Sequence, residues 1–558
     1  MLRIFKKSEH SFSFLNATQF LGALNDNLFK FFLVFFLINV EGSKEASTIL
    51  AIAGAVFVIP FLLFSSAAGV MADKISKTSI IISMKIAEVL IMSFGILAVF
   101  FKSTHALWGL LFLMAAQSAI FGPSKYGIIP EVVEPKKVSK ANGALNSFTF
   151  LAVIIGTFLA SFITDITNKN FVLASLLCLV VAIIGLFTSI KITKTAARSS
   201  KKKINPLFIY EIYKTLKATK KRPYLLITVI GSAYFLFIGG FAQLNIIPFA
   251  MQSLNMTAVG GGYLFLVTAI GIAVGSYIAG KLSKEEVELA ISCVAGFILS
   301  ILLLTLSLFS FSFPIVVICL LLLGIFGGIF LIPFDAYIQL KSPDRRRGQI
   351  IAAANFLSFC GVLLASFFLY FISSLLKLSP AFGFFLMGII TFVFNLIITG
   401  KLADYFIPFI GKKLLFLLYK IDYDKIPQNS ILILQKKKWI EALLLFTFIP
   451  NLKVLTSSYK HTLFKKLFSN IYVIKQKYLK SYFEKAIKIS KINLTTCIYS
   501  DAKFKLNQVK NNIPSNINDH YQNIYIVDVK YILVQKKFLL MNFHKKMLSY
   551  SFYPVTID

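Results

Sequence analysis

Four ionisable side chains lie inside long apolar segments of this chain. Asp26 and Lys30 are four residues apart in the first segment, and Lys85 and Glu88 are three apart in the third. On a helix, residues at these spacings share one face. A charge near the centre of a bilayer costs about 2.5–3.5 kcal/mol on insertion scales. Each pair therefore predicts either a site for a charged ligand or an ion pair that serves insertion and helix packing.

Other polar side chains accompany these charges along the apolar segments. They lie on both sides of Asp26 in the first segment, and others lie after the fourth segment and within the seventh. We expect polar groups at such positions to face a cavity, and their alternative role is helix packing. The predicted cavity residues are Gln19, Asn25, Asp26, Asn27, Lys30, Lys125, Gln243 and Asn245.

The elements that position these residues are twelve long apolar segments. Apolar residues make up 57% of the 558-residue chain, the mean hydropathy is +0.77, and each segment is near the ~20 residues that cross a bilayer. The sequence thus predicts an all-α polytopic membrane protein. Its expected spans are 14–38, 49–71, 79–101, 106–122, 142–164, 171–190, 224–250, 259–280, 289–311, 314–333, 349–372 and 381–404.

The net charge of +34 is distributed as a membrane topology signal. Lysine and arginine concentrate in every second loop between the spans, that is, on one side of the membrane, and in the segment 191–223. This bias predicts that these loops and both chain ends are cytoplasmic. Anionic membrane lipids are an expected partner of this basic surface, and nucleic acid is not. The five cysteines are scattered, so neither a disulfide framework nor a metal site is expected. We expect no cofactor.

The chain divides into two similar halves. A basic linker, 191–223, separates six spans within 1–190 from six within 224–405, and in each half a proline (Pro123, Pro333) closes the fourth span. Two six-helix pseudo-repeats joined by a cytoplasmic loop are the plan of transporters that rock about a midplane cavity. The sequence GVMADKISK at 69–77 also resembles the G-x-x-x-D-R/K-x-G-R/K motif of the major facilitator superfamily.

In that motif, Gly69 allows close helix approach and Asp73 can hydrogen-bond a neighbouring helix end when the cytoplasmic side is closed. Three further stretches, QFLGALNDN at 19–27, GPSKYGIIPE at 122–131 and SKANG at 139–143, resemble the lysophospholipid transporters of bacterial inner membranes. The second-half stretch 333–356 is similar too. We expect the motif residues to act in gating and conformational change: Gly69, Asp73, Lys74, Pro123, Tyr126, Glu131, Asn142, Asp335 and Asn355.

This resemblance implies the flipping of lysophosphatidylethanolamine-type lipids toward the cytoplasmic leaflet of the inner membrane. Such a headgroup carries an ammonium and a phosphate, which require a carboxylate and a cation or several donors. We expect Asp26 to engage the ammonium, assisted by Asn25 and Asn27, and Lys30 or Lys125 to meet the phosphate. Asp335 stands where the family pattern leads us to expect asparagine, which bears on headgroup selectivity.

The tail, 412–558, alternates short apolar runs with amphipathic stretches, which predicts a small cytoplasmic α/β domain. It resembles the glycerophospholipid acyltransferase of related fusion proteins, but QKKKWIE at 435–441 replaces that family's N-H-x-x-x-x-D. A protonated lysine cannot act as the general base in place of histidine. The block at 497–503 is eroded as well, so we expect an inactive acyltransferase-like domain.

Three alternatives remain open at this stage. The chain could transport a soluble solute or a drug, it could be a membrane-tethered 2-acylglycerophospholipid acyltransferase, or it could be a non-transporting scaffold. A separate acyltransferase/acyl-carrier-protein synthetase is a possible partner. Buried charge without a use is costly, which argues against the scaffold.

Overall fold

The computed structural model describes residues 9–41, 46–198, 200, 205, 207–220, 222–256, 258–282, 287–423, 430–435, 453–456, 471–473, 496–500, 523–538 and 541–554. The chain forms two compact units, Met1–Ile398 and Thr399–Asp558. Each unit is considered by itself below.

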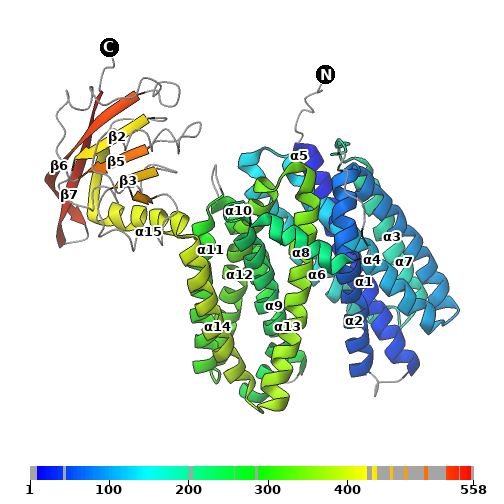
Figure 1. Cartoon of the computed structure of the whole chain (residues 1–558). Coiled ribbons are helices and arrows are strands. Elements are labelled where there is room, and N and C mark those ends of the chain that lie inside the picture. The colour runs from blue at the N-terminus through cyan, green and yellow to red at the C-terminus, as the bar shows by residue number, and fades with distance from the viewer. Residues whose placement is uncertain are drawn as a thin grey trace. The chain divides into compact units, whose positions relative to one another are not determined.

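Twelve helices in the described part of the chain are long and apolar enough to cross a membrane. This confirms the predicted all-α polytopic fold. Two groups of helices stand side by side (Figure 1). The first group is α1 (Glu9–Glu41), α2 (Ala46–Lys74), α3 (Lys77–Phe100), α4 (Thr104–Gly127), α6 (Val138–Ile166) and α7 (Phe171–Ile190). The second is α9 (Leu225–Ser253), α10 (Ala258–Leu282), α11 (Leu289–Leu308), α12 (Phe313–Lys341), α13 (Arg347–Tyr370) and α14 (Pro380–Lys401).

Shorter helices connect or follow these spans. A single turn, α5 (Ile129–Val132), follows α4. The linker, predicted as a basic loop, contains the helix α8 (Phe208–Thr219). The end of the bundle at which α2 and α12 finish and α3 and α13 begin is called the linker face below. The linker residues around Thr193 and Thr195 lie at this face, because both hydrogen-bond Thr78 near the start of α3.

Two helices are longer than the sequence predicted. Pro123 and Pro333 were expected to close their spans, but each lies inside a continuous helix, α4 or α12. The prediction was wrong because a proline removes one hydrogen bond and bends a helix without ending it when neighbouring helices support the turn. Both helices therefore carry the motif residues that follow the proline on a helical surface.

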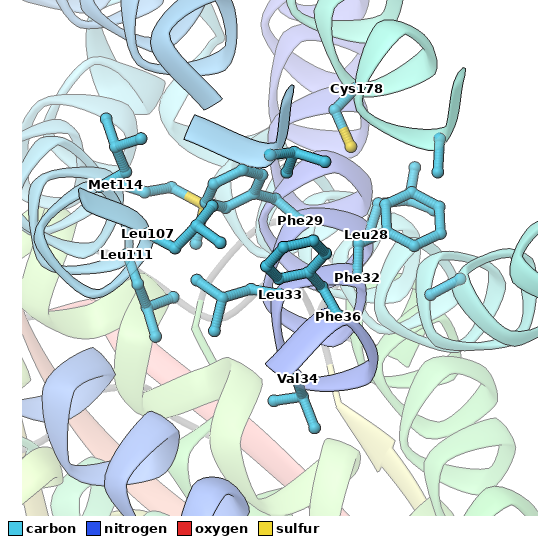
Figure 2. Packing of buried hydrophobic residues seen from close by; sticks show 14 of the residues in the cluster. Leu28, Phe29, Phe32, Leu33, Val34, Phe36, Leu107, Leu111, Met114 and Cys178 are labelled. Atoms are coloured by element: carbon cyan, nitrogen blue, oxygen red, sulfur yellow. The ribbon is translucent and has the colours of Figure 1, made fainter. Parts of the chain in front are cut away.

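The interior of the first half is packed around α1. Leu28, Phe32 and Phe36 of α1 are buried, and the Phe36 ring meets Phe171 of α7 edge to face with 5.4 Å between centroids. Leu111 of α4 lies in the same cluster (Figure 2). In a membrane such contacts stabilise helix association through packing rather than through removal of apolar surface from water.

In the second half, α10 and α12 cross backbone to backbone at glycines. A methyl group at Gly275 would collide with the main chain of Ile325, and one at Gly324 would collide with the carbonyl of Thr268. Gly271 lies four residues before Gly275, which gives α10 the small-xxx-small spacing that permits close helix approach. These glycines hold the helix that bears Asp335 at a fixed position against α10.

In the unit Thr399–Asp558, the described residues include α15 (Ala403–Leu418) and seven strands. The strands are β1 (Tyr419–Tyr423), β2 (Ser430–Gln435), β3 (Lys453–Thr456), β4 (Ile471–Val473), β5 (Thr496–Ser500), β6 (Asn523–Phe538) and β7 (Met541–Pro554). They form one sheet in the order β1-β7-β6-β2-β5-β3-β4, in which only β6 and β7 pair antiparallel. Most of 435–441 and half of 497–503 lie outside the described residues, so the acyltransferase resemblance stays a prediction.

Candidate substrate passage and its closure

Asp73 joins the two halves at the linker face. Its Oδ1 accepts the backbone N–H of Gly348 at 2.7 Å, and its Oδ2 accepts the backbone N–H and the side-chain amide of Gln349 at 3.1 and 3.0 Å. These donors belong to the first turn of α13, where a carboxylate also meets the positive end of the helix dipole. The contact between Asp73 and a helix end that the motif predicted is therefore present.

Gly69, one turn earlier on α2, makes this approach possible. A methyl group there would lie 2.6 Å from Cβ of Ala352 and 2.8 Å from Cα of Gln349. Asp73 could not reach the start of α13 with a larger side chain in this place. Lys74 is only partly buried and is not the motif lysine that forms the buried ion pair at this face; that residue is Lys77.

Lys77 forms a buried ion pair within a larger group of charges at this face. Its Nζ lies 2.8 Å from Oε1 of Glu131, with side-chain exposures of 0% and 5%. Arg198 of the linker donates to the same Glu131 oxygen at 3.3 Å and lies 4.0 Å from Asp344, which precedes α13. Glu131 was expected from the family pattern, whereas Lys77 and Arg198 were not chosen as site residues. Lys77 could have been predicted, because it occupies the second basic position of the motif at 69–77. No pattern in the sequence around Arg198 indicates its contact with Glu131.

A second inter-half contact is a reciprocal amide pair. The Nδ2 of Asn142 on α6 donates to Oε1 of Gln339 on α12 at 2.9 Å, and the Nε2 of Gln339 donates back to Oδ1 of Asn142 at 2.7 Å. Both side chains are buried, so separating the halves here would expose two donors and two acceptors. Asn142 was predicted as a gating residue, but its partner was missed because it lies 197 residues away.

Asp26 lies in the first half with one carboxylate oxygen engaged. Its Oδ2 accepts from Oγ of Ser118 on α4 at 2.7 Å. Its Oδ1 has no hydrogen-bond partner among the described residues. No lysine, arginine or histidine nitrogen of the described residues lies within 4.0 Å of this carboxylate. The expected alternative of a self-neutralising Asp26–Lys30 pair is therefore wrong for this structure.

Two lysines near Asp26 also lack a carboxylate partner within that distance in the described part of the chain. The Nζ of Lys30 lies over the rings of Phe31 and Phe57, 4.9 and 5.3 Å from their centroids. The Nζ of Lys125 lies 4.9 Å from the ring centroid of Tyr126. Both cations interact electrostatically with Asp26, and aromatic rings stabilise them only weakly.

The other predicted pair forms as an ion pair. Nζ of Lys85 lies 2.6 Å from Oε2 of Glu88, and both side chains are buried. The Nδ2 of Asn25 donates to Oε1 of Glu88 at 2.8 Å. Asn25 therefore links α1 to α3 through its Nδ2, while its Oδ1 has no hydrogen-bond partner among the described residues. This cluster fits the packing alternative, since each charge in it has a partner.

The remaining predicted cavity residues occupy different environments. Gln19 is buried and donates to Thr149 of α6 at 3.1 Å, and Asn27 donates to the Ala23 carbonyl one turn back while remaining partly exposed. Gln243 is exposed. Asn245 is buried and donates to the Pro380 carbonyl at 2.8 Å. Its Nδ2 joins α9 to the start of α14, and its Oδ1 has no hydrogen-bond partner among the described residues, so the cavity role of Asn245 stays a prediction.

Asp335 of α12 is partly exposed, although its helix neighbours are buried. Its Oδ1 accepts from Oγ of Ser232 on α9 at 2.8 Å, and its carboxylate interacts electrostatically with the Tyr126 hydroxyl of the first half. Asn355 lies beside Gly122 of α4, where a methyl group would come 3.3 Å from its Nδ2. Helix α4 of the first half thus faces α13 of the second.

The two helical bundles thus contain partly exposed charged groups and are joined at the linker face, an arrangement that fits binding and transfer of a ligand. Among the described residues there is no group of three or more His, Cys, Asp or Glu placed to hold a metal ion. Two bundles of six spans with a closing contact at the linker face define a two-half membrane transporter. The family model described as Major Facilitator Superfamily matches residues 15–366, and the chain belongs to that superfamily.

Within this superfamily, the chain is similar to lysophospholipid transporters. The lysophospholipid transporter LplT of Escherichia coli (strain SE11) is 27% identical over 345 residues, which are 60% of this chain and 82% of that protein. The LplT of Klebsiella pneumoniae (strain 342) is 25% identical over 345 residues, with the same coverage of 60% and 82%. The resemblance predicted from the motifs is therefore confirmed across the membrane unit.

Solved structures agree on the fold. The E. coli fucose:proton symporter FucP superposes with a TM-score of 0.58 at 14% identity, covering 71% of this chain and 99% of the symporter. A bacterial homologue of the iron transporter ferroportin, in an outward-facing state, gives 0.55 at 15% identity, covering 70% of this chain and 99% of that homologue. At these identities the likeness concerns the fold alone.

Proposed function

We propose that this chain moves lysophospholipids, of the lysophosphatidylethanolamine type, across the bacterial inner membrane to the cytoplasmic leaflet. The observation that carries the proposal is the incomplete pairing of charge around Asp26. One oxygen of this carboxylate has no partner among the described residues, while Lys30 and Lys125 nearby have only aromatic contacts and electrostatic attraction to it. Similarity to LplT supports the substrate class.

A zwitterionic headgroup completes this arrangement. Its ammonium can bind the free Oδ1 of Asp26, and its phosphate can bind the ammonium of Lys30 or Lys125. Bonds between ionised partners are roughly twice as strong as neutral ones. The paired Lys85–Glu88 site offers no such opportunity, because its charges already satisfy each other.

Transport would proceed by alternating access, with the halves 1–190 and 224–405 rocking about this site and the linker 191–223 joining them. The contacts of Asp73 and Asn142 would hold the linker face closed in one state, and they would be broken in the other. The excess of lysine and arginine in the linker and adjoining loops supports a cytoplasmic linker face, with both chain ends on that side.

The tail, 412–558, would serve as an inactive acyltransferase-like domain, and re-acylation of the delivered lipid would require a separate acyltransferase/acyl-carrier-protein synthetase. The support is the sequence QKKKWIE at 435–441, which lacks the histidine base. An acyl-transfer assay of the purified full-length protein tests this: the expected result is no acylated product, and product formation would contradict it.

Uptake into vesicles that contain the purified protein tests the substrate class. Labelled lysophosphatidylethanolamine is added outside, with unlabelled lysophospholipid, diacyl phospholipid or a soluble sugar as competitor. We expect competition by the lysophospholipid alone. Asp26→Asn should lower uptake, because it removes the charge that holds the ammonium, while the surface control Glu134→Gln should leave uptake unchanged. Full uptake by Asp26→Asn would exclude the proposed role of this carboxylate.

A further inference from the structure

The charged residues Lys125 and Asp335 occupy equivalent positions in the two halves. Each is the second residue after a proline inside a long helix, Pro123 in α4 and Pro333 in α12. The two halves thus present opposite charges at matching places. Both side chains are partly exposed, whereas the residue on either side of Asp335 is buried.

Tyr126 stands between these two charges. The ammonium of Lys125 lies 4.9 Å from the centroid of the Tyr126 ring. The hydroxyl of the same tyrosine interacts electrostatically with Asp335, and it contacts Asn146 at 3.3 Å. The Tyr126 phenol therefore lies beside the positive group of its own half, and its hydroxyl interacts electrostatically with the negative group of the other half.

Asp335 has little to neutralise it. Ser232 donates one hydrogen bond to its Oδ1, and no basic nitrogen of the described residues lies within 4.0 Å. The carboxylates Glu88 and Glu131 each have a lysine at 2.6 or 2.8 Å. A partly enclosed carboxylate with one hydroxyl donor favours a cationic ligand, because burial disfavours its isolated charge.

Asp335 also lies nearer the linker face than Asp26 does. It is six residues from the end of α12 at Lys341, or about 9 Å along the helix axis, whereas Asp26 is seventeen residues from the start of α1, or about 26 Å. Lys125 interacts electrostatically with Asp26 and shares Tyr126 with Asp335. Because its position matches that of Asp335, Lys125 lies on the linker-face side of Asp26: it is seven residues, or about 10 Å along α4, beyond Ser118, which binds Asp26.

We propose that Lys125, Tyr126 and Asp335 form a second headgroup site, at which Asp335 takes the ammonium of a zwitterionic phospholipid after Asp26 has released it. Lys125 retains the phosphate during this transfer, so the headgroup pivots toward the linker face. The site selects for headgroups that carry an amine. This inference rests on the proposed function and deepens it by naming the group that specifies the headgroup.

The test compares two lipids in vesicles that contain full-length protein. Lysophosphatidylethanolamine carries an ammonium, and lysophosphatidylglycerol does not. For Asp335→Asn we expect uptake of the first to fall about tenfold or more, the effect of one charge-assisted contact, and uptake of the second to change by less than about twofold. Asp335→Glu should restore the preference, and the surface control Glu134→Gln should match the wild type.

The ratio of the two uptake rates is measured within one preparation, so it is independent of how much variant folds. An unchanged ratio in Asp335→Asn, or an equal loss with both lipids, would overturn the second site while leaving lysophospholipid transport intact. A wild-type protein that takes up neither lipid would overturn the proposed function and this inference together. A changed pH dependence with an unchanged ratio would assign Asp335 to proton coupling and also overturn the inference.

Discussion

Replacing Asp73 by asparagine should open the linker face measurably. The carboxylate accepts three hydrogen bonds at the start of α13, two of them from backbone N–H groups of Gly348 and Gln349. Asparagine retains one acceptor oxygen, but its NH₂ group faces a donor, and the charge at the helix N-terminus is lost. A bond to a charged group contributes about 1.5–3 kcal/mol against about 1 for a neutral one, and the helix-end charge adds about 0.3–1.

The expected loss is therefore about 2 kcal/mol, or about thirtyfold in the ratio of closed to open states. If about 99% of the wild-type molecules are in the closed state, about three-quarters of the variant molecules will be in that state. Spin labels at Ile75, directly after the end of α2, and at Lys341, the last residue of α12, are both at exposed positions. They would report the distance across the linker face by pulsed electron paramagnetic resonance, with the five native cysteines replaced.

The wild type should give one short distance, and Asp73→Asn should add a longer one. Glu134→Gln is the matched control, because it makes the same change from carboxylate to amide at an exposed residue that forms no hydrogen bond or ion pair with α13 in the described part of the chain. A distance distribution in Asp73→Asn identical to that of the wild type would refute the assignment of Asp73 to closure.

Two further results are expected from the packing. Glu131→Gln and Lys77→Met should each lower the thermal midpoint of unfolding in detergent, because each leaves a buried charge without its partner at a cost of about 3–5 kcal/mol. The double variant should lose much less stability than the sum of the two single losses. Additive losses would exclude a coupled pair. Gly275→Val should prevent monodisperse folding, because its side chain meets the backbone at Ile325, whereas Gly109→Val, at a position with open space around it, should fold normally.

The sequence predicted the features that depend on composition and on local spacing. Twelve spans follow from segment length and apolarity, and the ion pair of Lys85 and Glu88 follows from three-residue spacing on one helix face. The same rule failed to predict the partners of Asp26 and Lys30. Residues four apart share a face, but Ser118 of α4 and Phe57 of α2 offer contacts that the spacing cannot reveal.

Contacts between distant helices could not be predicted from one sequence. Asn142 pairs with Gln339 and Arg198 with Glu131 because the fold brings separate segments together at the linker face. The hydrogen bond of Asn245 to the Pro380 carbonyl is a further contact of this kind, because its partner lies 135 residues away. The motif glycine at position 69 was informative because close approach leaves no room for a side chain.

Transfer of a one-tailed phospholipid between leaflets is the central claim, and extraction by albumin measures it directly. Fluorescent lysophosphatidylethanolamine is added to the outer leaflet of vesicles, and albumin then removes whatever remains outside. Vesicles with the wild-type protein should protect a fraction of the lipid that grows with time, and vesicles with Asp26→Asn should protect much less. Equal extraction from vesicles with wild-type protein and from protein-free vesicles would contradict the account.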